Sequence, residues 1–195
     1  MIRKTTPKVK NGRVQKKNRH DFTPNYWNTR QVELQFDTLK PGKGYKHFLN
    51  KNDIKRFLEI LPNWKEIDIE LDAILLTEGG GPDGWYYNGK VAICAWPKDK
   101  TSSFTKEYFN DHKRIFDQLN VKYEIKKDGV VCHFEESQIK AYQLLHIFLH
   151  EIGHHHDRIS TKKRKHLPNG EPYAESYAEK YEKIIWHKYF EEFGY

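Results

Sequence analysis

The strongest constraint on the fold is the apolar stretch IKAYQLLHIFLH at residues 139–150, which runs directly into the histidine-rich segment EIGHHHD at 151–157. It is apolar enough to form a buried helix, which we expect over roughly 136–157. Such a helix carries His146, His150 and His154 on adjacent turns. Buried imidazoles are costly unless a metal ion or a hydrogen bond satisfies them. We therefore expect this helix to place its polar residues against specific partners.

Within this helix the sequence HEIGH places His150 and His154 four residues apart, so both imidazoles share one helix face. This spacing lets two histidines reach one tetrahedral zinc ion at about 2.0–2.1 Å each. Glu151 lies about 100° round the helix from His150, close enough to contact a water at the metal. Gly153 leaves room beside the metal for neighbouring backbone or for substrate. We predict His150 and His154 as zinc ligands and Glu151 as general base.

The other histidines of the segment have simpler interpretations. We expect His146 to be a hydrogen-bonded core residue. His155 and His156 are expected to form a solvated helix end that the C-terminal helix dipole favours.

A catalytic zinc site needs a third protein ligand and one open position. The metzincin spacing would require glycine at position 156 and histidine at 160, where this chain has His156 and Ser160, so that arrangement is excluded. A second helix is predicted from Pro172, which suits a first helical turn, to about Phe193. Its segment EPYAESYAEKYE, residues 171–182, offers acids one turn apart as the third ligand.

Among these acids we predict Glu175 as the third zinc ligand, because the small residues Ala174 and Ala178 beside it let the two helices approach closely. Glu179, one turn further on, is expected to accept the outer N–H of a zinc-bound histidine. Asp157 is an alternative for that contact. The remaining acids of this helix are expected to be solvated charges: Glu171 and Glu182.

The rest of the chain predicts strands and helices in mixed order. Strands are expected through Val32, Leu34 and Phe36, and through Ile67, Ile69 and Leu71 into the apolar run AILL. Hairpins are expected at GWYYNGKVAICAWP, turning at Asn88-Gly89, and between YEIKK and VVCHF around Asp128-Gly129.

Helices are expected from Asn50 or Asn52 to Leu61, stopped by Pro62, and over 104–119. GGGPDG, residues 79–84, leads into a strand instead of a helix, so it predicts a loop and not a dinucleotide site.

The length of 195 residues fits one domain, and no internal repeat is visible. No run of eighteen apolar residues occurs, and the basic N-terminus lacks the apolar segment of a secretory signal. The two cysteines, Cys94 and Cys132, lie in apolar runs and are expected to be buried thiols. These features predict a soluble cytoplasmic protein without a membrane segment.

The net charge of +7 comes from the N-terminus. Residues 1–20 hold eight Lys or Arg and no acid, which leaves 26 basic against 27 acidic residues in the remaining chain. We expect residues 1–25 to be a disordered basic tail and residues 26–195 to be a single domain. Residues 1–20 are a candidate for weak nucleic-acid contact through phosphates, although no base-reading motif accompanies them.

HEIGH followed by ESYAEKY, residues 175–181, resembles the HExxH…E arrangement of gluzincin-type zinc metallopeptidases. It is especially similar to the small bacterial ImmA/IrrE-like peptidases, in which HExGH pairs with a downstream E-x-x-A segment. The resemblance covers about residues 146–181. It implies an α+β, zincin-like fold, in which a small mixed sheet with hairpins packs on the HExxH helix and a C-terminal ligand helix. It also implies that His150, His154 and Glu175 hold Zn²⁺ for peptide-bond hydrolysis.

The expected mechanism uses Glu151 to take a proton from water and deliver it to the leaving amine. A second donor would hold the oxyanion of the tetrahedral intermediate. Tyr177 joins Glu151 in the predicted catalytic set, while Tyr173 and His155 stay open as alternatives. A different functional class is also open, namely a non-catalytic zinc-binding zincin-like protein whose basic tail binds nucleic acid. The oligomeric state and the identity of a peptide or protein substrate do not follow from the sequence.

Overall fold

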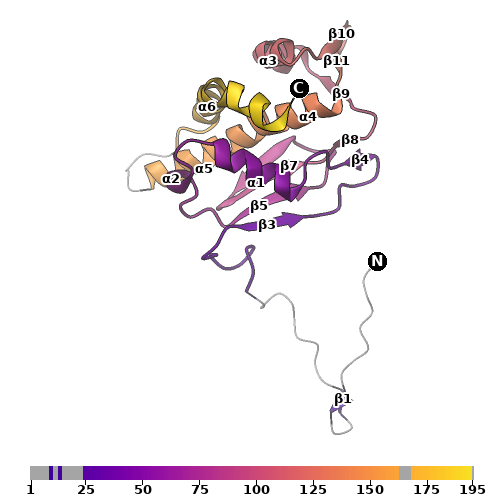
Figure 1. Cartoon of the computed structure of the whole chain (residues 1–195). Coiled ribbons are helices and arrows are strands. Elements are labelled where there is room, and N and C mark those ends of the chain that lie inside the picture. Colours follow the sequence, from indigo (N-terminus) through magenta and orange to yellow (C-terminus); the bar gives the residue numbers. More distant parts are fainter. Residues whose placement is uncertain (1–8, 11–12, 15–23, 163–167, 195) are drawn as a thin grey trace.

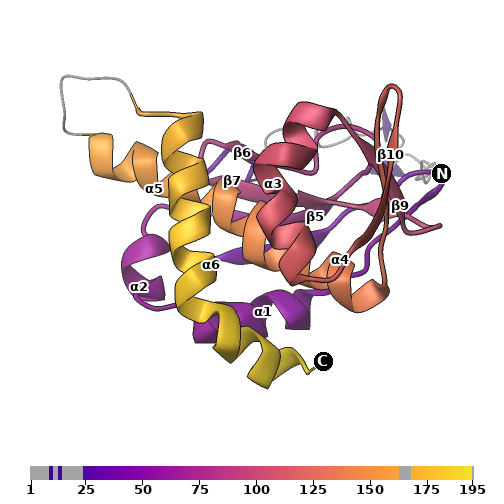
Figure 2. The same cartoon turned by 90° about the horizontal axis from the view of Figure 1, so that it is seen from above.

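A computed structural model of the chain describes residues 9–10, 13–14, 24–162 and 168–194 (Figure 1). It has an α+β fold, as predicted, with the long helices gathered on one face of a four-stranded sheet (Figures 1 and 2). Strands β3, β5 and β7 run parallel, and β6 lies antiparallel to β7 at the edge. In sheet order the strands are β3 (Gln35–Thr38), β5 (Ala73–Thr77), β7 (Lys90–Cys94) and β6 (Gly84–Tyr87).

The two central strands, β5 and β7, are buried at every position. A continuous apolar sequence is typical of parallel strands that are covered on both faces. Helices cover one face, and the partly buried rings of Tyr26 and Trp85 pack on the other. The turn between β6 and β7 is the predicted one, because Asn88 and Gly89 both have positive φ angles of 49° and 80°.

A second, antiparallel sheet lies beside the helical layer and has the order β10-β11-β9 (Figure 2). Its strands are β9 (Thr101–Phe104), β10 (Lys122–Lys126) and β11 (Gly129–His133). Helix α3 (Lys106–Gln118) connects β9 to β10 and begins at Thr105, whose hydroxyl accepts a hydrogen bond from the backbone N–H of Tyr108. Two short ladders complete the described strands: β4 (Tyr45–Lys46) with β8 (Trp96–Pro97), and β1 (Val9–Lys10) with β2 (Arg13–Val14).

Helix α1 (Lys51–Ile60) forms where its capping signal predicts. The side chain of Asn50 accepts from the backbone of the first turn, and Asp53 accepts from the backbone N–H of Asn50 in return. Its predicted apolar face is buried, and a short helix α2 (Trp64–Ile67) follows.

The histidine-bearing helix is continuous but changes its winding midway. It consists of α4 (Glu136–Tyr142), a π-helical stretch η2 (Gln143–Phe148) and α5 (Leu149–Thr161). Helix α6 (Glu171–Phe193) packs across α5 (Figure 2). A Cβ atom at Gly153 would lie 2.8 Å from the Cα of Ala174, so the two backbones touch there. The predicted close approach through small residues of α6 is confirmed.

Two strand predictions are correct only in part: β3 contains Phe36 and β5 contains the run AILL, but the residues predicted before them do not lie in strands. Val32 is fully exposed and precedes β3, which begins three residues later at Gln35. Ile67 ends helix α2 and Ile69 is 55% exposed, so their alternation with Leu71 does not mark a strand. In both segments the tertiary packing overrides a short period-two pattern. The second hairpin turns at Lys127–Asp128, because Gly129 already pairs with Lys126.

The predicted disorder and nucleic-acid contact of the N-terminal segment fall mostly on residues outside the described ones. Cys94 and Cys132 are buried and free, as predicted. Among the described residues, no helix is both long and apolar enough to cross a membrane.

Candidate metal centre

A cleft of about 690 Å³ opens between the histidine-bearing helix, the start of α6 and the second sheet. The glycine-rich loop at Gly80–Asp83 and strand β9 form part of its wall. The polar side chains along its floor come from η2, α5, α6 and α3: His146, His150, Glu151, Glu171, Glu175 and His112. The loop that resembles a dinucleotide motif is therefore a cleft wall that leads into β6, in agreement with the sequence-based prediction.

Three side chains converge beside this cleft: His150 and His154, predicted as ligands, and Glu171, expected to be solvated. His150 and Glu171 line the cleft itself. The Nε2 atom of His150 lies 3.1 Å from one carboxylate oxygen of Glu171. The Nε2 atom of His154 lies 3.3 Å from the other oxygen of the same carboxylate. The ligand atoms of all three residues lie within 4.8 Å of one another. Because zinc binds imidazole nitrogen and carboxylate oxygen at about 2.0–2.2 Å, one ion fits among these atoms.

Glu175, the acid predicted as third ligand, contacts His150 on its other ring nitrogen. Its carboxylate oxygen Oε2 lies 3.1 Å from Nδ1 of His150. This hydrogen bond lowers the pKa of Glu175 to about 2. Burial alone would lower the pKa of His150, but the hydrogen bond to Glu175 and the charges of Glu151 and Glu175 raise it above its usual value.

The ring of His150 thus lies between two carboxylates that can only accept hydrogen bonds when ionised. A neutral imidazole carries one N–H, so it can satisfy only one of them. The second nitrogen needs either an additional proton or a metal ion facing Glu171. The donor set around His150 and His154 therefore fits a divalent cation.

Glu151 lines the same cleft and is 7% exposed. Burial raises the pKa of its carboxyl group to about 7, with the charge of Glu171 adding to the rise and His150 opposing it. Strand β6 begins directly against it, since a Cβ atom at Gly84 would lie 3.0 Å from Cγ of Glu151. A carboxyl group with this pKa can both take up and release a proton near neutral pH.

The three candidates for an oxyanion donor do not line the cleft. Tyr177 is buried on α6, where its ring stacks on that of Tyr181 with a centroid distance of 4.4 Å. The hydroxyl of Tyr173 lies 2.7 Å from Nδ1 of His156. His155 is buried with Nε2 3.0 Å from the carbonyl oxygen of Ile69.

His155 and His156 therefore do not form the solvated helix end that the sequence suggested. His155 is 1% exposed, and burial lowers its pKa to about 4. Its side chain fastens α5 to the segment before β5 and to Tyr86 of β6.

The predicted roles of the neighbouring acids also change. Glu179 pairs with Lys183 on the exposed side of α6, and within the described part of the chain it does not contact a histidine of α5. Glu182, expected to be solvated, is 1% exposed and forms two hydrogen bonds of 2.7 Å with the guanidinium of Arg114. The pairing to α3 explains its burial, because a buried carboxylate needs a partner charge.

Asp157 acts on the geometry of α6 instead of on a histidine. Its carboxylate accepts hydrogen bonds of 2.8 Å from the side chain of Asn169 and from the backbone N–H of Gly170. Gly170 immediately precedes Glu171, so Asp157 holds the first residue of α6 against α5. Asp157 is therefore a positioning residue for Glu171.

The sequence predicted Glu171 as a solvated charge and gave no role to His112, yet both line the cleft. For Glu171 a signal existed, because Glu171 and Glu175 repeat on α6 the four-residue spacing of His150 and His154 on α5. His112 gave no signal, since it lies on α3 in a segment without a motif. His146 is buried as expected, but its ring makes no hydrogen bond to the described residues, contrary to the prediction. Burial together with the neighbouring His112 lowers its pKa to about 3.

No protein-family model, no curated protein and no solved structure matches this chain. The function of the cleft is therefore inferred from its own residues and their geometry.

Proposed function

We propose that the protein is a zinc-dependent peptidase with a zincin-like fold, and that the cleft is its active site. The observation that carries the proposal is the convergence of His150, His154 and Glu171 beside the buried carboxyl group of Glu151. Two imidazoles and a carboxylate are a donor set that catalytic zinc sites use, with further positions left for water or substrate. The resemblance of HEIGH and ESYAEKY to gluzincin-type peptidases supports the same activity.

In this proposal Glu171 is the third ligand, and Glu175 orients His150. Among the acids of the described residues, Glu171 is the one that contacts Nε2 of both histidines. Glu175 instead accepts the Nδ1 proton of His150, which directs the lone pair of Nε2 towards Glu171. Carboxylates commonly hold metal-binding histidines in this way, and they raise the basicity of the ligand nitrogen.

Zinc at such a site acidifies water and polarises a scissile carbonyl group. The chain supplies the proton transfers. Glu151 takes a proton from the attacking water and returns it to the leaving amine nitrogen. Burial raises the pKa of this carboxyl group, and a raised pKa favours a carboxylate that takes up a proton before it releases it.

The edge strand β6 supports a peptide as substrate. It is the outer strand of the main sheet, and it begins at the cleft next to Glu151. An extended peptide can add to such an edge through main-chain hydrogen bonds, which would place one of its peptide bonds near Glu151. Cys94 and Cys132 are free and buried, which suits the reducing cytoplasm that we propose as its location.

The proposal is tested by Glu151→Gln, which keeps the shape of the side chain but removes its basic oxygen. The wild type should cleave members of a library of quenched fluorescent peptides when it carries zinc. The variant should bind the same amount of zinc and lose at least about 10²-fold in turnover. Glu179→Gln, on the exposed side of α6, is the control and should keep full activity. Undiminished turnover in Glu151→Gln would refute the proposed mechanism.

A further inference from the structure

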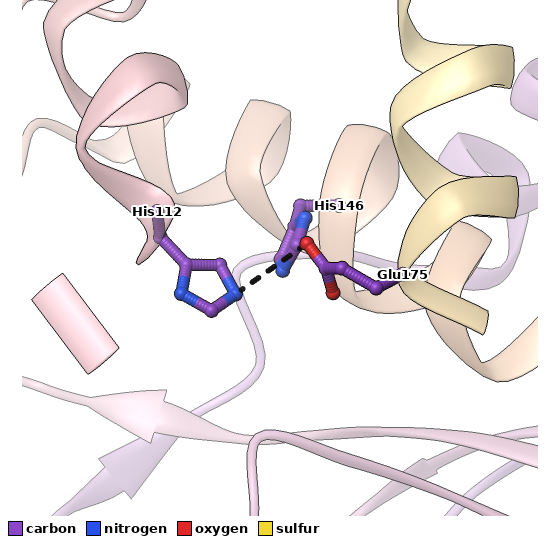
Figure 3. Close-up of side chains that lie close together, drawn as sticks. All are labelled: His112, His146 and Glu175. Atoms are coloured by element: carbon purple, nitrogen blue, oxygen red, sulfur yellow. Dashed lines mark ion pairs between the residues drawn. The ribbon is translucent and has the colours of Figure 1, made fainter. Parts of the chain in front are cut away.

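A second group of side chains that could hold a metal ion lines the cleft next to the proposed zinc site. It consists of His112 from α3, His146 from η2 and Glu175 from α6 (Figure 3). One ligand atom from each lies within 4.8 Å of the others. The rings of His112 and His146 stand edge to face, with centroids 4.5 Å apart, and both lie beside the carboxylate of Glu175 (Figure 3).

The hydrogen bond at the far side of His112 determines which nitrogen faces the group. Nδ1 of His112 lies 2.7 Å from the backbone carbonyl oxygen of Tyr108. A carbonyl oxygen only accepts, so Nδ1 carries the proton and Nε2 of the neutral ring has a free lone pair. This is the arrangement that fixes a histidine as a metal ligand through Nε2.

The gap between His112 and Glu175 has the width of a metal site and not of a hydrogen bond. Nε2 of His112 and Oε1 of Glu175 are 3.9 Å apart, beyond hydrogen-bonding distance. Both atoms present electron pairs to the gap between them. The other oxygen of Glu175 already accepts from His150, which leaves Oε1 available.

His146 contributes an imidazole that has no hydrogen bond within the described part of the chain. It is only 5% exposed, and its ring contacts are with other rings, those of Tyr142, His112 and His150. Because His146 lines the cleft, its ring nitrogens are accessible there to a ligand or to water, which would supply the missing hydrogen bond or metal contact. The π-helical winding of η2 carries His146, and such stretches often occur at functional sites.

We propose that His112, His146 and Glu175 bind a second divalent transition-metal ion, separate from the zinc held by His150, His154 and Glu171. Two neutral imidazoles and one carboxylate form a donor set that suits zinc, and also iron(II) or manganese(II). One ion cannot serve both groups, because Nε2 of His150 faces Glu171 and its Nδ1 is already bonded to Glu175. Glu175 lies between the two sites, with one oxygen towards each.

The test is the zinc stoichiometry of the full chain, purified without a histidine tag, dialysed against buffered Zn²⁺ and measured by plasma mass spectrometry. His112→Asn is the main variant, since the asparagine amide can still donate to the carbonyl of Tyr108 while the ligand nitrogen is lost. His154→Asn removes a ligand of the first site. His187→Asn, exposed on α6, is the matched control, and His146→Gln reports on the second site from another helix.

We expect two zinc ions per chain in the wild type and in His187→Asn, and one in each of the other variants. The second site would be ruled out if the wild type bound one ion that His154→Asn lost and His112→Asn kept, a result that leaves the proposed peptidase site intact. Two ions retained in His112→Asn and His146→Gln would also rule it out. One ion that is lost in His112→Asn but kept in His154→Asn would support the second site and contradict the ligand set of the first.

Discussion

At the scale of single residues, the cleft is distinguished by acids whose surroundings move their pKa values in opposite directions. The hydrogen bond from His150 lowers the pKa of Glu175 to about 2, whereas burial raises the pKa of Glu151 to about 7. Opposite shifts of this kind separate a permanently ionised carboxylate from one that can transfer protons. The chemistry that we propose therefore depends on where each carboxylate lies as much as on its identity.

Asp83, in the wall of the cleft, gives a pH-dependent prediction. Burial raises its pKa to about 6, while a hydrogen bond with Tyr108 opposes the rise. An acid whose pKa is higher in the folded protein than in the unfolded chain lowers the unfolding free energy as pH rises from about 4 to about 6. Asp83→Asn removes this loss, so its stability relative to the wild type should increase by about 2 kcal/mol between pH 4 and pH 7.

Urea unfolding of both proteins at the two pH values measures this difference. Asp111→Asn, at an exposed position on α3, is the control and should show no such trend. A stability difference between Asp83→Asn and the wild type that is the same at both pH values would show that Asp83 ionises freely in the folded protein.

At the scale of helices and strands, the contact between α5 and α6 determines which acid meets the histidines. Glu171, Glu175 and Glu179 follow one another at single-turn intervals, so the sequence alone could not tell which turn faces His150 and His154. The choice depends on the crossing point at Gly153 and Ala174 and on the anchoring of Gly170 by Asp157. These contacts join residues distant in sequence, which explains why spacing predicted Glu175 for the position that Glu171 occupies in the structure.

Gly153→Ala tests the importance of this crossing. The added methyl group would lie 2.8 Å from the Cα atom of Ala174, which is backbone and cannot move aside without shifting α6. We expect a loss of about 1–3 kcal/mol in unfolding free energy and weaker zinc binding, because Glu171 would move away from the histidines. Thermal unfolding and zinc titration measure the two effects.

Gly81→Ala is the matched control, since no atom lies within 4 Å of its added methyl group. It should leave stability and zinc affinity close to those of the wild type. If Gly153→Ala and Gly81→Ala had equal stability and zinc affinity, α5 and α6 could move apart without losing unfolding free energy.

At the scale of the whole molecule, the sequence predicted most helices and both hairpins because their signals are local. The cap at Asn50, the turn at Asn88-Gly89 and the apolar helix before His150 each lie within a short segment. The arrangement of α3 over the cleft could not be predicted, since it brings His112 next to residues of η2 and α6 without any motif near it. The grouping of His112 with His146 and Glu175 could therefore not be predicted from the sequence.

The pair between Arg114 of α3 and Glu182 of α6 fastens the second sheet and its helix to the main body. Glu182 is buried, and each of its oxygens lies 2.7 Å from the guanidinium. Glu182→Gln should lower the unfolding free energy by about 1.5–3 kcal/mol, because two hydrogen bonds between charged groups are weakened, whereas the half-exposed Arg114 can still be hydrated.

Chemical denaturation provides the measurement, and Glu179→Gln is the control. Glu179 pairs with Lys183 in solvent, so its replacement should cost less than about 1 kcal/mol. A similarly small loss for Glu182→Gln would show that the Arg114–Glu182 pair does not hold the two parts together.

The central claim is that His150, His154 and Glu171 hold zinc, and anomalous diffraction at the zinc absorption edge tests it most directly. Crystals of the full chain grown with Zn²⁺ should show an anomalous peak at about 2.0–2.2 Å from Nε2 of both histidines and from a carboxylate oxygen of Glu171. Absence of a peak between these three residues, in crystals that contain zinc elsewhere, would contradict the account. A peak ligated by Glu175 in place of Glu171 would contradict the ligand assignment.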